Sequence, residues 1–246
     1  MIPLRIALAA LMCLLYPSAR HRVEARNIVA TPDGVAVATT DQGGRRRDLV
    51  TYGESAQQVH QFPDLPGAVR GFDDVAVDQD SARDGRAIVF AIDADSALVC
   101  SFRLSFRRQV RDGRVSMRFI GCSTQGVSVN PYVGIAAQGG TLVVSGGTGG
   151  VSIFRYNTST GRLDDRPTIR NRDLGQVGHP GVTMISRDMA ALCTDSRRSN
   201  RSGSSEFGLT IANINTGTRS VRDARFFRVP DTVGFDYAIQ PGKRSL

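Results

Sequence analysis

The chain has 246 residues, of which 41% are hydrophobic and 26 are glycines, so it can bury the core of one large domain or two small ones. Its net charge of +8 comes almost entirely from arginine, because Lys243 is the only lysine. Acidic residues are interspersed with the arginines, which favours a generally basic surface over a dedicated nucleic-acid site. We therefore expect no nucleic-acid partner, and a protein or an acidic ligand instead.

Residues 1–25 are typical of an export signal. Arg5 gives a short positive start, Ile6 to Tyr16 form an apolar stretch, and Val23-Glu24-Ala25 offers a small-residue cleavage pattern, with Ala19 as another possible site. The apolar stretch has 11 residues, whereas a membrane-spanning helix needs about 20. We therefore expect a cleaved signal, no stable membrane span and a secreted or lumenal protein. An uncleaved anchor or a wrongly assigned start of the chain is the alternative.

Residues 26–246 carry a recurring pattern of short apolar strands separated by turn residues. The pattern is clearest from Tyr132 to Leu163, where two apolar runs flank a glycine-rich link, Gly146 to Gly150, and a Thr160-Gly161 turn follows. This link could cradle a phosphate, but it joins two strands rather than opening a helix, which favours a hairpin. The predicted strands, in four groups, are 28–31, 35–40, 48–52 and 57–62; 74–78, 87–92, 97–104 and 115–121; 127–137, 141–145, 151–156 and 167–170; and 182–186, 189–194, 208–213 and 224–229.

The start of each group repeats, which predicts one domain built from similar units. Val69, Val127, Val177 and Val233 open these repeats and are separated by 58, 50 and 56 residues. A period near 50 with four strands in each unit is typical of propeller blades. We therefore predict an all-β domain over residues 26–246, a β-propeller with about four to five blades. The ring is either small, with the C-terminal strand joining the N-terminal unit, or an incomplete fragment of a larger propeller.

Val151 to Leu163 resembles the end of a WD-type repeat, in which a strand runs into an aromatic position and then a Thr-Gly turn. Tyr156 stands where that family usually has Trp, and the chain contains no Trp and lacks the characteristic Gly-His pair. The sequence is therefore similar to the loose WD-like and lactonase-like propellers, over residues 27–240, and the similarity lies in the repeat rather than in a specific motif.

The direction of the strands predicts which side chains share a face. In a four-stranded meander, the links into the first strand and those between the second and third strands emerge on one face, which we call the entrance face. Asp74, Asn130, His179 and Asp236, with Asp73 beside them, occupy the links into first strands. Oxygen ligands converging there can hold Ca²⁺, so Asp74, Asn130 and Asp236 are the predicted metal ligands. The same residues can instead cap strands and bind turn backbone.

Such a calcium site resembles that of the calcium-dependent lactonase propellers of the gluconolactonase and paraoxonase type, where the metal polarises an ester carbonyl. The resemblance implies hydrolysis of lactones or esters. The chain has no Gly-x-Ser-x-Gly, His-Glu-x-x-His or Cys-x-x-Cys motif, and only His60 and His179 lie outside the signal region. We therefore predict a binding or protein-interaction module that uses its entrance face, with a calcium-dependent lactonase or esterase as the alternative.

Arginine clusters are also predicted on the entrance face, where they can steer an acidic ligand or protein in a salt-dependent manner. The predicted binding residues are Arg45, Arg46, Arg47, Arg197, Arg198 and Arg201. A second set is expected on the opposite face, and this division argues against one continuous nucleic-acid track. It comprises Arg107, Arg108, Arg111 and Arg114. Solvated loop charge is the alternative explanation for all of these residues.

The cysteines and sequons are compatible with export. If Cys13 is removed with the signal, three cysteines remain, and Cys100 and Cys122 can form a disulfide that leaves Cys193 unpaired. The alternative is that all three are buried thiols. Glycosylation is predicted at Asn157 and Asn200, because both begin an Asn-x-Ser/Thr sequon in a predicted turn.

Overall fold

The computed structural model describes residues 25–31, 34–40, 47–53, 57–82, 85–106, 115–123, 134–146, 150–171, 182–195, 207–218 and 220–228. These residues form sixteen β-strands and no helix, so none of them belongs to a helix able to cross a membrane. The strands make four antiparallel sheets of four strands each, every sheet formed by four consecutive strands. The predicted all-β class and the grouping of strands by four are therefore confirmed.

Sheet 1 contains β1 (Ala25–Ala30), β2 (Ala36–Thr40), β3 (Leu49–Tyr52) and β4 (Gln57–His60). Sheet 2 contains β5 (Asp74–Val77), β6 (Arg86–Asp93), β7 (Leu98–Phe106) and β8 (Val115–Cys122). Sheet 3 contains β9 (Gly134–Gln138), β10 (Thr141–Ser145), β11 (Val151–Arg155) and β12 (Ile169–Asn171). Sheet 4 contains β13 (Val182–Ser186), β14 (Met189–Asp195), β15 (Phe207–Asn215) and β16 (Ser220–Arg228).

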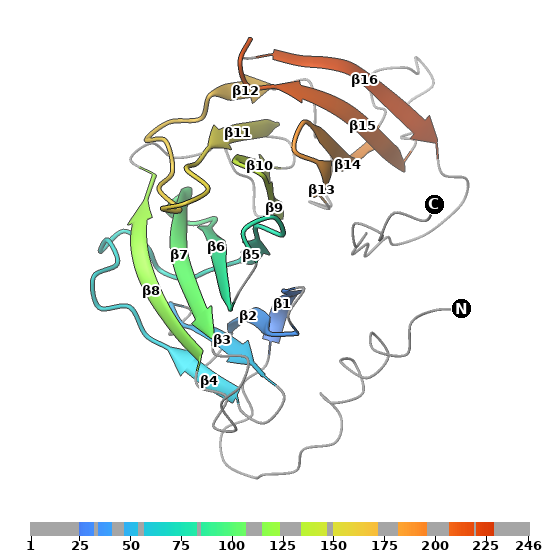
Figure 1. Ribbon diagram of the computed structural model, residues 1–246. Helices are drawn as coiled ribbons and strands as arrows, with labels where there is room; N and C mark the ends of the chain where they lie inside the picture. Colours follow the sequence, from blue (N-terminus) through green and yellow to red (C-terminus); the bar gives the residue numbers. More distant parts are fainter. Residues whose placement is uncertain are drawn as a thin grey trace, which may run out of the picture.

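The four sheets follow one another in chain order with their first strands innermost (Figure 1). β1 contacts β5, β5 contacts β9, and β9 contacts β13. The fourth strands, β4, β8, β12 and β16, lie at the periphery of the same view. The first strand of each sheet thus meets the first strand of the next.

Three hydrophobic cores fill the spaces between successive sheets. Successive residues of a strand point to opposite faces, so Val89 of β6 packs toward sheet 1 while its neighbour Phe90 packs toward sheet 3. In the same way, Leu142 of β10 packs toward sheet 2 and Val143 toward sheet 4. Because both faces of sheets 2 and 3 are covered, β6 and β10 contain uninterrupted apolar runs rather than alternating ones.

The glycine-rich link between β10 and β11 has the predicted hairpin role. β10 and β11 pair antiparallel, and the Gly146 N–H donates to the Gly150 carbonyl at 2.8 Å. β16 starts at Ser220, four residues before the predicted start, because Ser220 still pairs with Asn215 of β15. The strand predicted over 127–137 is described only from Gly134, and residues 127–133 lie outside the described part of the chain.

Contacts in sheet 2 confirm the grouping of links expected for the entrance face. Asp73, in the link into β5, accepts a hydrogen bond from the Ala94 N–H in the β6–β7 turn at 2.7 Å. Asp93, at the end of β6, accepts one from the Arg70 N–H at 2.7 Å. The link into the first strand and the link between the second and third strands therefore lie together. The opposite face, formed by the links between first and second and between third and fourth strands, is called the far face below.

Candidate functional site

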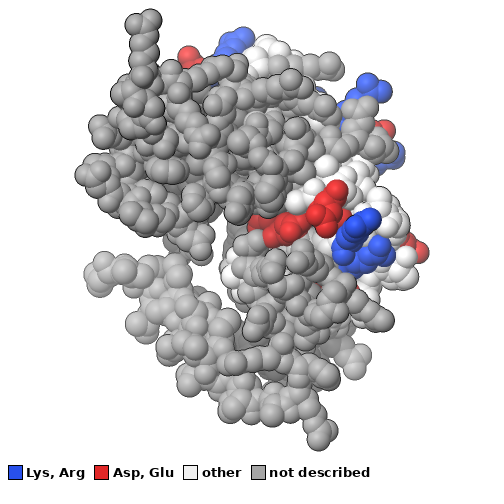
Figure 2. All heavy atoms as spheres, turned by 180° about the vertical axis from the view of Figure 1, so that it is seen from behind, with Lys and Arg blue, Asp and Glu red and all other residues white. Residues whose placement is uncertain are grey.

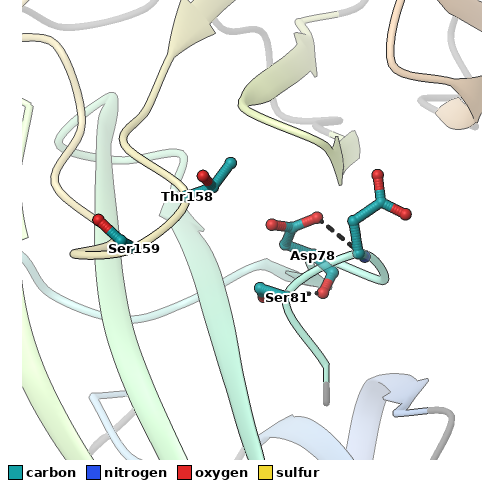
Figure 3. A pocket seen from close by; sticks show the side chains of 5 residues that line it. Asp78, Ser81, Thr158 and Ser159 are labelled. Atoms are coloured by element: carbon teal, nitrogen blue, oxygen red, sulfur yellow. Dashed lines mark hydrogen bonds between the residues drawn. The ribbon is translucent and has the colours of Figure 1, made fainter.

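A hollow of about 470 Å³ lies on the far face, between sheets 2 and 3. It is formed by the β5–β6 turn and by the link between β11 and β12 (Figure 3). Its lining residues are all polar, and two of them are acidic: Asp78, Asp80, Ser81, Thr158 and Ser159. The hollow is thus acidic and rich in oxygen atoms, in a protein whose net charge is +8.

The β5–β6 turn is held by its own polar side chains. One carboxylate oxygen of Asp78, Oδ1, accepts the Asp80 N–H at 3.2 Å, which is a common turn-forming use of Asp. Ser81 donates its hydroxyl to the Asp78 carbonyl at 2.9 Å and accepts the Ile88 N–H at 3.0 Å. These bonds fix the turn against the start of β6.

The link from Tyr156 to Leu163 forms the other wall of the hollow. The Asn157 side-chain oxygen accepts the N–H groups of Ser159 and Thr160 at 3.0 and 2.9 Å. Gly161 has a φ of +77°, and a Cβ there would lie 2.6 Å from Ile120 Cδ1 of sheet 2. Arg103 of β7 donates to the Ser159 carbonyl at 2.6 Å. A link of sheet 3 is therefore fastened to sheet 2.

Two oxygen atoms at this junction, Asp78 Oδ2 and Tyr156 Oη, are closed to solvent. Asp78 is fully buried and Tyr156 is 6% exposed. Burial raises the pKa of the Tyr156 hydroxyl, and the charge of Asp78 and a hydrogen bond with its side chain raise it further, so Tyr156 stays neutral beside the carboxylate. In Figure 3 one Asp78 oxygen binds the neighbouring turn, and the carboxylate lies between that turn and the link that carries Thr158 and Ser159.

Asp78 also fastens sheet 2 to sheet 3. Its Oδ1 accepts the Gly139 N–H at 3.0 Å, and at the other end of β5 Asp74 Oδ2 accepts the Ile135 N–H at 2.9 Å. Both bonds join residues 61 positions apart in the chain. Asp74 at the start of β5 and Asp78 just after its end thus bind two amides four residues apart, one in β9 and one just after it, which holds β5 against β9.

Asp74, a predicted calcium ligand, uses both carboxylate oxygens in this junction. Oδ1 accepts the Val75 N–H at 2.8 Å and Oδ2 accepts the Ile135 N–H. Burial raises its pKa to about 7, against the opposing effect of these two hydrogen bonds. In the structure, Asp74 therefore performs the backbone-binding role that Asp residues commonly have at strand ends.

The other predicted entrance-face residues, Asn130, His179 and Asp236, lie outside the described residues. Within the described part of the chain, no three His, Cys, Asp or Glu side chains form a group able to hold a metal.

The predicted arginine site is described at one position. Arg47 is exposed and donates to the Gly67 carbonyl at 3.2 Å, which places it beside the link into β5. Arg45, Arg46, Arg197, Arg198 and Arg201 lie outside the described residues, as do Arg107, Arg108, Arg111 and Arg114. Figure 2 shows acidic and basic side chains next to each other on the described part of the surface seen from behind. Charge is therefore mixed on that part of the face.

The structure joins Cys100 and Cys122 by a disulfide that links β7 to β8, where the two residues are direct partners across the strands. Asn157 is exposed in its turn, and Asn200 lies outside the described residues. The hollow itself was not among the sequence predictions. The Asp78-x-Asp80 pair directly after a buried strand is the signal that could have pointed to it.

Comparison of the sequence with protein-family models and with curated proteins finds no match.

Proposed function

We propose that the four sheets are consecutive blades of a β-propeller. The proposal is supported by the meander order within each sheet, by the innermost position of β1, β5, β9 and β13, and by cores between successive sheets.

Closure of the ring requires the first and fourth sheets to approach each other. Cysteines placed at the exposed residues Ile28 and Ile185 should then be joined by a short thiol cross-linker. Failure of such pairs to cross-link within one molecule would indicate an open arc.

We further propose that the protein is an exported binding module. The disulfide between Cys100 and Cys122 supports export, because disulfides persist in oxidising compartments. The hollow between sheets 2 and 3 supports a binding role, and this is the observation on which the proposal rests. Its volume of about 470 Å³ is in the range of small-ligand sites, and its walls are fixed by hydrogen bonds to both sheets. The entrance-face arginines remain a predicted second surface.

A ligand screen on the whole mature protein tests the binding role. Thermal unfolding is measured with small cations, sugars, nucleotides and calcium, for the wild type and for Thr158→Trp, which fills the hollow from an exposed position. A ligand at a hundred times its dissociation constant should stabilise the protein by about 2.7 kcal/mol. That stabilisation should vanish in the variant. Chelator-sensitive turnover of lactones or aryl esters would instead establish the hydrolase alternative.

A further inference from the structure

β16 is the longest of the four outermost strands in the described part of the chain. It has nine residues, against four in β4, eight in β8 and three in β12. Every residue from Arg222 to Phe227 is exposed. β16 is the last strand of sheet 4 (Figure 1), so the backbone N–H and C=O groups along its outer edge do not take part in the pairing with β15. The sheet can therefore accept a further strand at this edge.

Two aromatic side chains of β16 are in contact with water. Phe226 is 38% exposed and Phe227 is 52% exposed, and they are neighbours on the strand. Phe119 of β8, by contrast, packs against Phe102 in the core between sheets 1 and 2. Successive residues of a strand point to opposite faces, so Phe226 and Phe227 lie on the two faces of this sheet edge. A strand added there would place side chains beside both.

A β-bulge limits the length of the regular edge. Arg225 to Arg228 pair in regular register with β15, and the register shifts between Arg225 and Arg222. Asp223, within this shift, has a φ of +49°. Because bulges interrupt strand pairing, the regular edge that β16 offers to another strand begins after Asp223.

The charge of this edge selects the partner. β16 contains three arginines, Arg222, Arg225 and Arg228, and one acidic residue, Asp223. Opposite charges on paired strands stabilise the pair, whereas like charges directly opposite each other destabilise it. Two copies of β16 would bring together two positively charged strands, in a protein of net charge +8. An acidic strand would instead be attracted.

We propose that the outer edge of β16 binds an extended, acidic segment of a partner protein, which adds to sheet 4 as a fifth antiparallel strand. Backbone hydrogen bonds to residues 225–228 hold the segment. Its carboxylates lie opposite Arg225 and Arg228, and its apolar residues lie opposite Phe226 and Phe227. This surface is separate from the hollow between sheets 2 and 3, so the inference does not depend on the binding role proposed for the hollow.

Fluorescence anisotropy with a labelled peptide tests the proposal on the whole mature protein. The probe is Thr-Glu-Val-Ile-Glu-Thr, which in the antiparallel direction places its glutamates opposite Arg225 and Arg228 and its apolar residues opposite Phe226 and Phe227. It should bind in a saturable way. The peptide with lysine in place of both glutamates should bind about tenfold more weakly, because favourable charge pairs become repulsive ones. No saturable binding, or equal binding of the two peptides, would overturn the proposal.

Backbone methylation of the probe separates strand addition from simple charge attraction. Alternate N–H groups of a strand point to the same side. A probe methylated on one set of alternate amides therefore loses its N–H donors to β16, whereas a probe methylated on the other set keeps them. The second peptide should bind like the unmodified probe, and the first should not bind. Binding by both, or by neither, would contradict the proposed strand pairing.

Matched variants assign the binding to β16. Arg225→Glu should weaken binding of the acidic probe about tenfold and strengthen binding of the lysine peptide. Arg118→Glu makes the same change at an exposed position of β8, another outermost strand, and should bind the probe like the wild type. Phe227→Ser should weaken binding severalfold, because it removes apolar surface that the added strand covers. Equal losses in Arg225→Glu and Arg118→Glu would show that the charge effect is not specific to β16, and would refute the site.

Two further measurements exclude other occupants and another location. In sedimentation equilibrium, the wild type should be monomeric at the concentrations used for the titration. A dimer that is lost in Phe227→Ser would show that a second copy occupies the edge, and would overturn the assignment to an acidic partner. Thr158→Trp, which alters the hollow, should bind the probe unchanged. Loss of binding in that variant would place the peptide in the hollow and reject the β16 site.

Discussion

Asp74→Asn should remove a pH dependence of stability from the junction of sheets 2 and 3. Burial raises the pKa of Asp74 from its ordinary 3.8 to about 7, so desolvation outweighs the hydrogen bonds from Val75 and Ile135. A folded-state pKa above the unfolded one gives a stability that is complete below the unfolded pKa and is lost as the pH rises through about 7. A pKa difference of about three corresponds to about 4 kcal/mol.

Thermal unfolding between pH 4 and pH 8 measures this effect. In a chain of this size, a change of 1 kcal/mol shifts the melting temperature by about 2–4 °C. The melting temperature of the wild type should therefore fall by about 8–16 °C relative to Asp74→Asn across that range. His60 is common to both proteins, so its contribution cancels in the difference. Asp95→Asn serves as the control and should follow the wild type. Parallel curves for the wild type and Asp74→Asn would refute the argument.

Three further predictions concern stability. Burial lowers the pKa of His60 below its ordinary 6.5. The stability that neutral His60 contributes is therefore complete above pH 6.5 and is lost as the pH falls through the pKa of the folded state. His60→Gln should reduce the loss of unfolding free energy that urea titrations measure between pH 7 and pH 5. Replacing Cys100 and Cys122 together by alanine should lower the free energy of unfolding by about 3 kcal/mol, and a reductant should then affect only the wild type. In the same urea assay, Gly161→Ala should lower the free energy of unfolding by about 1–3 kcal/mol more than Gly34→Ala. Both glycines have positive φ, but of the two only Gly161 has atoms within 4 Å of the added Cβ. Equal losses of unfolding free energy would contradict this.

The strands were predictable because their signals are local. The run Thr141–Ser145 ends in a glycine-rich hairpin, and the structure has β10 over the same residues. The direction of the strands also predicted that the link carrying Asp73 and the β6–β7 turn emerge on one face, because alternate links of a meander do so. In the structure a hydrogen bond joins the two. Local patterns of turn residues and apolar runs therefore sufficed for the strands and for the grouping of their links.

The hollow was not predictable from such signals. Thr158 and Ser159 are in the sequence only the end of a sequon, and Asp78 only the end of a strand. They come together because the 156–163 link of sheet 3 folds over sheet 2, where Arg103 binds the Ser159 carbonyl and Gly161 packs against Ile120. These contacts join residues from different sheets. A pattern read along one strand contains no information about which link covers its neighbour.

The two aspartate bonds at the ends of β5 make the hollow suitable for a ligand. Binding is weakened when a site must first be ordered, because the lost freedom of side chains and links opposes association. The bonds from Gly139 and Ile135 hold β9 against β5, so the Asp78 carboxylate has one oxygen committed and its orientation set. A ligand that contacts the exposed residues Thr158 and Ser159 therefore meets walls whose positions are already set.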